Sequence, residues 1–219
     1  MSIRDLFETE GRVWFRGAVS KEDLRVLEDV AGTGLKAGQR LDMSEKLRDC
    51  LSIERSIGRV IAQIDPDAKP VRAVSFNKSQ QTNWGVPWHQ DRVIAVRSRE
   101  NVSGFGNWSF KAGGWHCEPP LDLLETMLFV RIHLDDTDCD NGSMSIALGS
   151  HMEGAVRSGQ AEEIAQKYEI ETCEAKRGDL LVLKMLTLHA SGPSRLQTNR
   201  RVLRVDFSSF ELPKPMCWL

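Results

Sequence analysis

The chain has 219 residues, of which 41% are hydrophobic and 27% charged, enough for one domain with a substantial core. Its 29 basic and 31 acidic residues leave a net charge of −2, which argues against nucleic acid and against an anionic membrane surface as partners. No apolar run approaches the ~20 residues of a membrane span, and five scattered cysteines without a CxxC pair are typical of a reducing compartment. We therefore expect a soluble, cytoplasmic protein with a small-molecule substrate, and we find no signal for an oligomeric state.

Two helices are expected in the first third of the chain, so residues 1–69 are predicted to be a helical N-terminal part. In "SKEDLRVLEDVAG", Ser20 is the expected N-cap, Asp23 completes a capping box, and Gly32 ends the helix. In "MSEKLRDCLSIERSIGRVIAQI", residues 43–64, apolar side chains recur at helical spacing up to "DPDAKP".

After residue 70 the pattern changes to short runs rich in β-branched and apolar residues, separated by Gly, Asn, Asp and Pro. The runs are "VRAVSF", "RVIAVR", "TMLFVRIHL", "SMSIAL", "YEIETCEA", "DLLVLKML" and "RVLRVDFSSF". "CDNGS" carries the Asn-Gly signal of a hairpin, and "KRGDL" predicts a turn into a strand. We predict a mainly β fold with N-terminal helices: one domain over 1–219, with a double-sheet jelly-roll barrel over 70–210 and a tail over 211–219 that docks on the body or on a neighbouring subunit.

The segment 98–120 differs from these runs because it mixes glycine and proline breaks with aromatic residues. A long irregular connection in a compact domain is usually functional or disordered, and the aromatics favour function. We predict a lid over a pocket that Trp88, Trp108 and Trp115 line together; packing of these rings against the barrel rim is the alternative.

The run "VPWHQD" predicts a metal site. In an extended strand, His89 and Asp91 project from the same face because side chains alternate with period 2. His189 is the best third ligand, since it ends the apolar run "LLVLKMLTLH" before a "SGPS" turn and so lies at the mouth of a barrel. Two imidazoles and one carboxylate form the facial triad of non-haem Fe(II), which leaves three coordination positions for substrates; a structural zinc site would need four ligands, usually with thiolates.

Three open positions suit a bidentate co-substrate and dioxygen. 2-Oxoglutarate would bind through its 1-carboxylate and keto oxygens, and its distal carboxylate would need a forked cation. Arg200 is the predicted partner, with Arg201 as its competitor; strand alternation puts Arg201 with an apolar row and Arg200 on the other face. Arg131, within the apolar run "TMLFVRIHL", also needs an anionic partner if it faces inward.

In this order, "WHQD", "DNGSMSIALGSHMEG", "GDLLVLKMLTLHASGPS" and "NRRVLRVDFS" resemble the phytanoyl-CoA dioxygenase family of Fe(II)/2-oxoglutarate oxygenases, over most of the chain. The resemblance implies a double-stranded β-helix of the cupin-like type, with iron at His89, Asp91 and His189 and the co-substrate carboxylate at Arg200. By position in the same motifs, it also implies that Ser191 and Gln90 approach the co-substrate. Halogenating relatives replace the carboxylate ligand with a small residue, so Asp91 implies oxygenation.

The predicted function is hydroxylation of a C–H bond in a small metabolite or natural-product intermediate, with release of succinate and carbon dioxide. The alternatives are a barrel that binds a ligand or metal without turnover, and an isomerase or hydrolase that uses the triad with another metal. A clamp for 2-oxoglutarate argues against both. The other histidines, 116, 133 and 151, are expected in structural or lid positions. Lys78 is expected in a solvated turn, with contact to an anion as the alternative.

Overall fold

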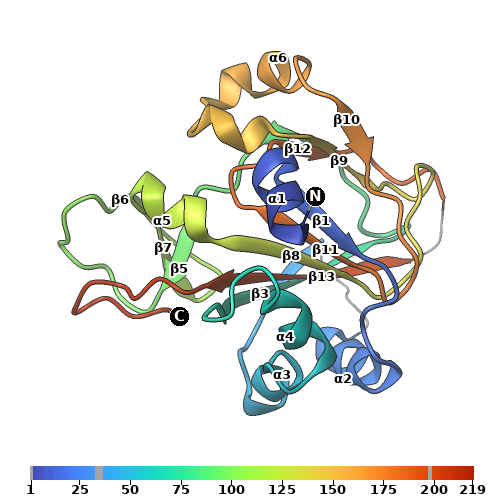
Figure 1. The fold of residues 1–219 in the computed structure, drawn as a ribbon, viewed down its shortest axis with the longest axis horizontal. Helices are drawn as coiled ribbons and strands as arrows, with labels where there is room; N and C mark the ends of the chain where they lie inside the picture. The colour runs from blue at the N-terminus through green and yellow to red at the C-terminus, as the bar shows by residue number, and fades with distance from the viewer. Residues whose placement is uncertain (1, 33–36, 197–198) are drawn as a thin grey trace.

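The computed structural model describes residues 2–32, 37–196 and 199–219. Two antiparallel sheets face each other, a six-stranded sheet in the order β1-β11-β8-β13-β3-β2 and a four-stranded sheet in the order β10-β9-β12-β4 (Figure 1). A smaller sheet, β5-β7-β6, lies at one end. The strands are β1 Arg12–Phe15, β2 Gly38–Leu41, β3 Lys69–Lys78, β4 Val86–His89, β5 Ile94–Val96, β6 Gly106–Lys111, β7 Gly114–Glu118, β8 Leu128–His133, β9 Met144–Ala147, β10 Ile170–Thr172, β11 Leu180–Lys184, β12 His189–Ser191 and β13 Arg200–Ser208.

The predicted mainly β, jelly-roll architecture is confirmed, and each of the seven predicted runs contains a strand. Between the two large sheets, Phe129, Leu181 and Leu183 pack against Met144 and Ile146. We call the face of the six-stranded sheet that carries Phe129, Leu181 and Leu183 the inner face. Among the described residues, no strand pairing joins the two large sheets into a closed barrel.

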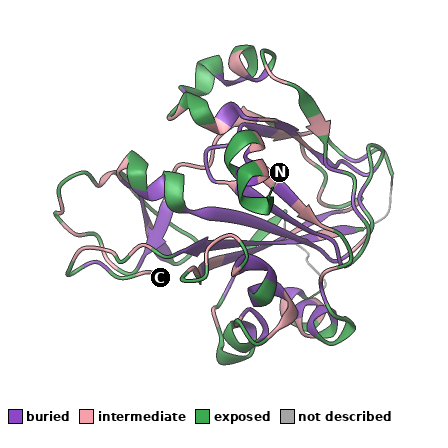
Figure 2. Cartoon of the chain, in the orientation of Figure 1, coloured by how far each residue is buried: buried purple, intermediate pink, exposed green. Residues whose placement is uncertain are grey.

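The outer face of the six-stranded sheet is covered by three helices, α2 Lys21–Ala31, α3 Glu45–Cys50 and α4 Ser56–Ile61 (Figure 1). Their buried side chains form one apolar core with the sheet, and the central strands β11, β8 and β13 are coloured mostly as buried in Figure 2. Three further helices, α1 Ile3–Glu10, α5 Leu121–Thr126 and α6 Ala161–Ala165, and the 3-10 turns η1 Ser150–Glu153 and η2 Ser158–Gln160 lie in the connections. No helix within the described ranges is both long and apolar enough to cross a membrane.

The single helix predicted over residues 43–64 is wrong: it is divided into α3 and α4. Ser20 caps α2 through the backbone N–H of Asp23, as predicted, but the Asp23 carboxylate does not complete the capping box. It accepts hydrogen bonds from the backbone N–H and the hydroxyl of Ser56, at 3.1 and 2.5 Å, and so begins α4. A carboxylate from another helix thus fixes the break, because N-terminal N–H groups need an acceptor.

The first 69 residues are not a purely helical part, which corrects the predicted division of the chain. β1 pairs with β11, and β2 pairs with β3, so both edge strands of the six-stranded sheet come from the N-terminal region. A short helix, α1, also precedes β1, with a capping box between Ser2 and Asp5. The N-terminal third therefore completes the sheet that carries the site.

The predicted irregular lid over 98–120 is instead a β-hairpin. β6 and β7 pair, and the connecting residues Ala112 and Gly113 have φ of 49° and 78°. Two successive positive φ values are those of a type I′ turn, which matches the twist of a hairpin. The C-terminal tail packs on the same small sheet, where the Leu219 N–H donates to the Ala95 carbonyl at 3.2 Å, so it docks on the body of its own chain.

The turn predictions are partly confirmed. Gly178 has φ of 92° in the turn before β11, as "KRGDL" predicts. Asn141 and Gly142 form a turn with positive φ at the glycine, but the predicted hairpin is wrong because the flanking strands, β8 and β9, belong to different sheets. All five cysteines are free thiols, and Cys50, Cys117 and Cys173 are buried.

Candidate metal centre

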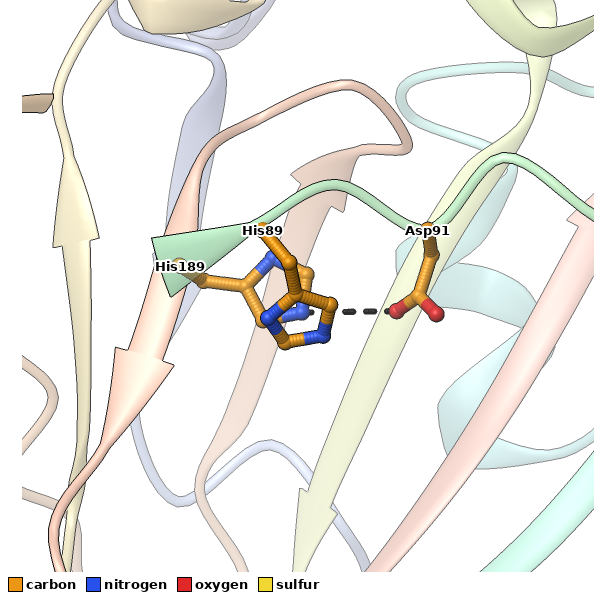
Figure 3. Close-up of side chains that lie close together, drawn as sticks. All are labelled: His89, Asp91 and His189. Atoms are coloured by element: carbon orange, nitrogen blue, oxygen red, sulfur yellow. Dashed lines mark ion pairs between the residues drawn. The ribbon is translucent and has the colours of Figure 1, made fainter. Parts of the chain in front are cut away.

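The three predicted metal ligands lie together. His89 ends β4, Asp91 follows two residues later, and His189 begins β12 (Figure 3). The two histidines are cross-strand partners whose ring centroids are 4.2 Å apart, and Nε2 of His189 lies 3.3 Å from Oδ2 of Asp91. One ligand atom from each residue lies within 4.8 Å of the others. Among the described residues, this is the one cluster of three or more metal-binding side chains.

His189 reaches this position by a route that the sequence did not indicate. The predicted strand ends at Lys184, and the chain then crosses to the four-stranded sheet, where His189 starts a new strand. The crossing brings His189 beside His89 from a distance of 100 residues.

Both imidazoles are held in one tautomer. Nδ1 of His89 lies 2.8 Å from the Pro87 carbonyl oxygen, and Nδ1 of His189 lies 2.9 Å from the Thr187 carbonyl oxygen. Because a carbonyl only accepts, each Nδ1 carries the proton and each Nε2 keeps its lone pair for a metal. Burial, followed by the neighbouring His189, lowers the pKa of His89 and favours this neutral form.

Asp91 is ionised and held from behind by an arginine. Burial alone would raise the pKa of Asp91, but the ion pair with Arg204 and the contacts with the two histidines keep it well below its usual value. Arg204 also donates from Nε and Nη2 to the two oxygens of Asp206, at 2.7 and 3.1 Å, and its guanidinium lies over the Phe129 ring. Asp91 therefore has a fixed orientation and a full negative charge.

These donors fit a first-row divalent metal. Two neutral imidazole nitrogens and one carboxylate oxygen on one side of the ion are the ligand set of the Fe(II) facial triad. A closed structural zinc site would need a fourth protein ligand, and within the part of the chain that the structure describes no cysteine joins the cluster.

A cavity of about 220 Å³ adjoins the triad. Its lining includes the three ligands and five other ionisable residues: Arg72, Lys78, Arg131, Arg200 and Arg204. Arg200 is 2% exposed, and its Nε and Nη1 have no hydrogen-bond partner among the described residues. A buried guanidinium without acceptors is costly, so the cavity is built for an anion.

The choice between Arg200 and Arg201 is visible in the strand geometry. Arg201 points away from the cavity and forms a two-pronged ion pair with Asp135, with Nε and Nη2 at 2.9 and 2.8 Å from the carboxylate oxygens. On the same side as Arg201, Leu203 and Val205 join the outer core, as the predicted alternation requires. Of the two arginines, Arg200 alone lines the cavity.

Two of the three other residues predicted to bind the co-substrate lie at the cavity, and the third does not. Ser191 and Arg131 line the cavity. Gln90 does not: its amide donates to the carbonyls of Gly154 and Leu186, at 2.8 and 2.7 Å, and its oxygen accepts from the Val156 N–H. The assignment of Gln90 is corrected, because a residue between His89 and Asp91 must project from the opposite side of the chain.

Lys78 is a cavity residue that the sequence analysis placed in a solvated turn. β3 continues through it, and it is 1% exposed. Its Nζ donates to the Ser191 hydroxyl at 3.1 Å and to two backbone carbonyls. Burial, and then Arg200 and Arg131, lower its pKa to about 7. Lys78 is an even number of positions from Phe76 and Arg72 on β3, so strand alternation in the sequence could have placed it on the cavity side.

The three predicted pocket tryptophans are not among the residues that line this cavity. Trp88 faces away from the triad for the same reason as Gln90 and packs near α6. Trp108 and Trp115 lie in the β6–β7 region, and their ring centroids are 6.4 Å apart. This position agrees better with the predicted alternative, in which the rings pack on the body of the protein, than with a role in lining the pocket. The aromatic residues of the cavity are instead Phe76, Trp84 and Phe129.

The remaining histidines have structural surroundings. His133 ends β8, and its Nδ1 lies 3.1 Å from the Thr137 hydroxyl, which agrees with the expected structural position. Nε2 of His151 lies 3.0 Å from the Glu8 carbonyl oxygen. His116 is fully buried on β7 and contacts Arg40.

The family model described as phytanoyl-CoA dioxygenase (PhyH) matches residues 12–202. No curated protein matches the sequence. Similar solved structures include AviO1 from Streptomyces viridochromogenes Tue57, at 17% identity and a TM-score of 0.65, with 96% of this chain and 95% of that one covered.

Two further structures have the same fold at low identity. The non-heme alpha ketoglutarate dependent epimerase SnoN from nogalamycin biosynthesis is 14% identical, with a TM-score of 0.65 and coverage of 97% and 89%. EctD from S. alaskensis, solved with 2-oxoglutarate and 5-hydroxyectoine, is 14% identical, with a TM-score of 0.68 and coverage of 93% and 74%.

Proposed function

Because the chain belongs to the phytanoyl-CoA dioxygenase (PhyH) family, we propose that it is an Fe(II)- and 2-oxoglutarate-dependent oxygenase. It consumes 2-oxoglutarate and dioxygen, releases succinate and carbon dioxide, and hydroxylates a C–H bond of a small molecule in the cytoplasm. The iron ligands are His89, Asp91 and His189. One observation carries the proposal: this cluster shares a cavity with the buried guanidinium of Arg200, whose Nε and Nη1 have no hydrogen-bond partner among the described residues.

In this proposal, Arg200 binds the distal carboxylate of 2-oxoglutarate. Lys78 and Arg131 line the same cavity and contribute positive charge, and the Ser191 hydroxyl lies beside Lys78. A carboxylate at this position would supply the acceptors that Nε and Nη1 of Arg200 lack. Burial, followed by the neighbouring Arg131, lowers the pKa of Arg200 to about 9, and a bound carboxylate would relieve the repulsion between the two arginines.

The bound iron supplies the oxygen chemistry, and the protein supplies geometry and a water-poor cavity. The carbonyls of Pro87 and Thr187 orient the imidazoles, and Arg204 orients Asp91. Phe129 and Trp84 line the cavity with aromatic surface, which limits the access of water.

The test is an anaerobic titration of the Fe(II)-loaded protein with 2-oxoglutarate, observed through the weak visible charge-transfer band of the chelate. Arg200→Gln should need about 10- to 100-fold more co-substrate, because it removes charge-assisted hydrogen bonds. Arg201→Gln is the matched control, since Arg201 is the next residue on the strand and is paired with Asp135 outside the cavity.

Loss of binding in the Arg201 variant with full binding in the Arg200 variant would contradict the assignment. No band in the iron-loaded wild-type protein would contradict the oxygenase itself. Once succinate release has identified a substrate, a product with one added oxygen atom supports hydroxylation. An unchanged mass instead indicates epimerisation, the activity in the name of the structurally similar SnoN.

A further inference from the structure

A second cationic region lies on the inner face, far from Arg200. In the register of β13 with β3, Arg200 is opposite Lys78, and Asp206 is opposite Arg72. Residues 72 and 78 are six positions apart on β3, so their Cα atoms are about 20 Å apart at the usual rise of a strand. A five-carbon diacid anchored at Arg200 is too short to reach Arg72, yet both arginines line the same cavity.

The inner face has more positive than negative side chains. At the edge of this face, Arg12 on β1 is already paired with Glu10 and Glu171. Among the other described residues, the cationic ones at its positions are Arg40, Arg72, Lys78, Arg131, Arg200 and Arg204. The buried or half-buried anionic ones around them are Asp91 and Asp206, and the exposed Asp42 lies beside Arg40. A divalent metal and the 2-oxoglutarate dianion would cancel each other's charge. The excess of positive charge therefore remains when metal and co-substrate are both bound, and a further anion is needed to balance it.

Arg72 is the cation whose hydrogen-bonding capacity is least used at this end. Its one carboxylate neighbour in the described structure is Asp206, at 3.5 Å between Nη1 and Oδ2. Both Asp206 oxygens already accept hydrogen bonds from Arg204. Nε and Nη1 of Arg72 are buried and have no hydrogen-bond partner in the described ranges. These N–H groups are free to bind an anion that enters the cavity.

A second arginine extends the region. Arg40 is opposite Val74 in the pairing of β2 with β3, so it projects from the same side of the sheet as Arg72. The two arginines line an adjoining cavity of about 280 Å³. Nη2 of Arg40 contacts Nε2 of His116, whose pKa burial and Arg40 lower to about 4, so that neighbour is neutral. Nε and Nη1 of Arg40 also have no hydrogen-bond partner among the residues described.

We propose that the substrate carries a carboxylate or phosphate group that binds Arg72, at the end of the cavity opposite Arg200. This deepens the proposed function and rests on it, because the Arg200 end is assigned to the co-substrate. Such an anion accepts from the unpartnered N–H groups of Arg72 and places the rest of the substrate toward the triad. Arg40 adds positive charge beside it.

The test uses calorimetric titration of protein loaded with Mn(II) and saturating 2-oxoglutarate, with benzoate, phenyl phosphate and the neutral benzamide as probes. At least one anion should bind the wild-type protein and benzamide should not; the preferred anion identifies the group. Arg72→Gln should weaken the binding at least tenfold, and Arg72→Lys should restore part of it. Lys69→Gln, an exposed position on the same strand, is the control and should bind as the wild type does.

Three results would overturn the proposal. The anions could bind Arg72→Gln as tightly as the wild type, benzamide could bind the wild type as tightly as the anions, or the loaded wild-type protein could bind no anion. If saturating 2-oxoglutarate abolishes the binding of the anion, the anion binds at Arg200, and this result would also overturn the proposal. The titration without metal and co-substrate separates the two hypotheses. If the oxygenase assignment fails, no chelate band forms, but anion binding that depends on Arg72 persists in this arm.

Discussion

At the scale of single residues, Asp206 connects the candidate metal centre to the sheet. It accepts two hydrogen bonds from Arg204, which in turn holds Asp91. Asp206→Asn leaves Arg204 with one full carboxylate partner and should lower the affinity for Mn(II) by about 10- to 100-fold, because groups behind a ligand usually have effects of this size. Electron paramagnetic resonance of free Mn(II) measures it.

Asp135→Asn is the control for this change, since Asp135 pairs with Arg201 on the same strand but outside the cavity. It should keep the wild-type metal affinity. Equal metal affinity in the Asp206 variant and the wild type would show that Arg204 holds Asp91 without the help of Asp206.

Lys78 predicts a pH dependence of co-substrate binding. Its pKa in the free protein is about 7 because burial and then Arg200 disfavour the ammonium form. A bound carboxylate favours that form and raises the pKa, so at pH 8 the complex takes up a proton and affinity falls as the pH rises above about 7. Calorimetry at pH 8 in two buffers of different ionisation enthalpy measures the uptake; in Lys78→Met it should disappear, and its absence in the wild type would contradict the prediction.

At the scale of elements, the break between α3 and α4 depends on close packing at Gly58. A Cβ built there lies 2.0 Å from the carbonyl oxygen of Ser52, within the backbone that links the two helices. Gly58→Ala should therefore destabilise the protein by about 1–3 kcal/mol, which is the usual cost of overpacking. The urea midpoint of unfolding measures this change.

Gly159→Ala is the matched control, because nothing lies within 4 Å of a Cβ at that position. Its midpoint should differ little from that of the wild type. A Gly58 variant with an unchanged midpoint would mean that the link between the helices shifts at little cost. Neither variant should change the 2-oxoglutarate titration, since both positions lie outside the cavity.

Alternation along strands explains both successes and errors of the sequence analysis at this scale. It correctly paired His89 with Asp91 and separated Arg200 from Arg201. The same rule, applied to Gln90 and Trp88, would have excluded both from the cavity. The rule would also have placed Lys78 on the same side as Phe76, which precedes it by two positions on β3.

At the scale of the whole molecule, ligand binding should stabilise the fold. A ligand that binds the folded state alone, at 100 times its Kd, adds about 2.7 kcal/mol. For a chain of this size, that raises Tm by about 5–10 °C. Mn(II) and then 2-oxoglutarate should each give such an increment in a thermal melt. Arg200→Gln should keep the metal increment and lose the co-substrate increment; loss of both would mean that Arg200 supports the metal centre itself.

Local patterns were enough to predict the mainly β fold and to place His89 and Asp91 on one side of the chain, because side-chain chemistry and period-2 alternation are local properties. They also favoured Arg200 over its neighbour. Three features depend on packing between distant segments. The Asp23 carboxylate accepts from the backbone N–H at the start of α4, and His189 lies in the second sheet. Arg72, Lys78 and Arg200 line one cavity. The physical reason is that hydrogen-bond partners and desolvation depend on strand register and packing between residues far apart in the chain, which no local pattern encodes.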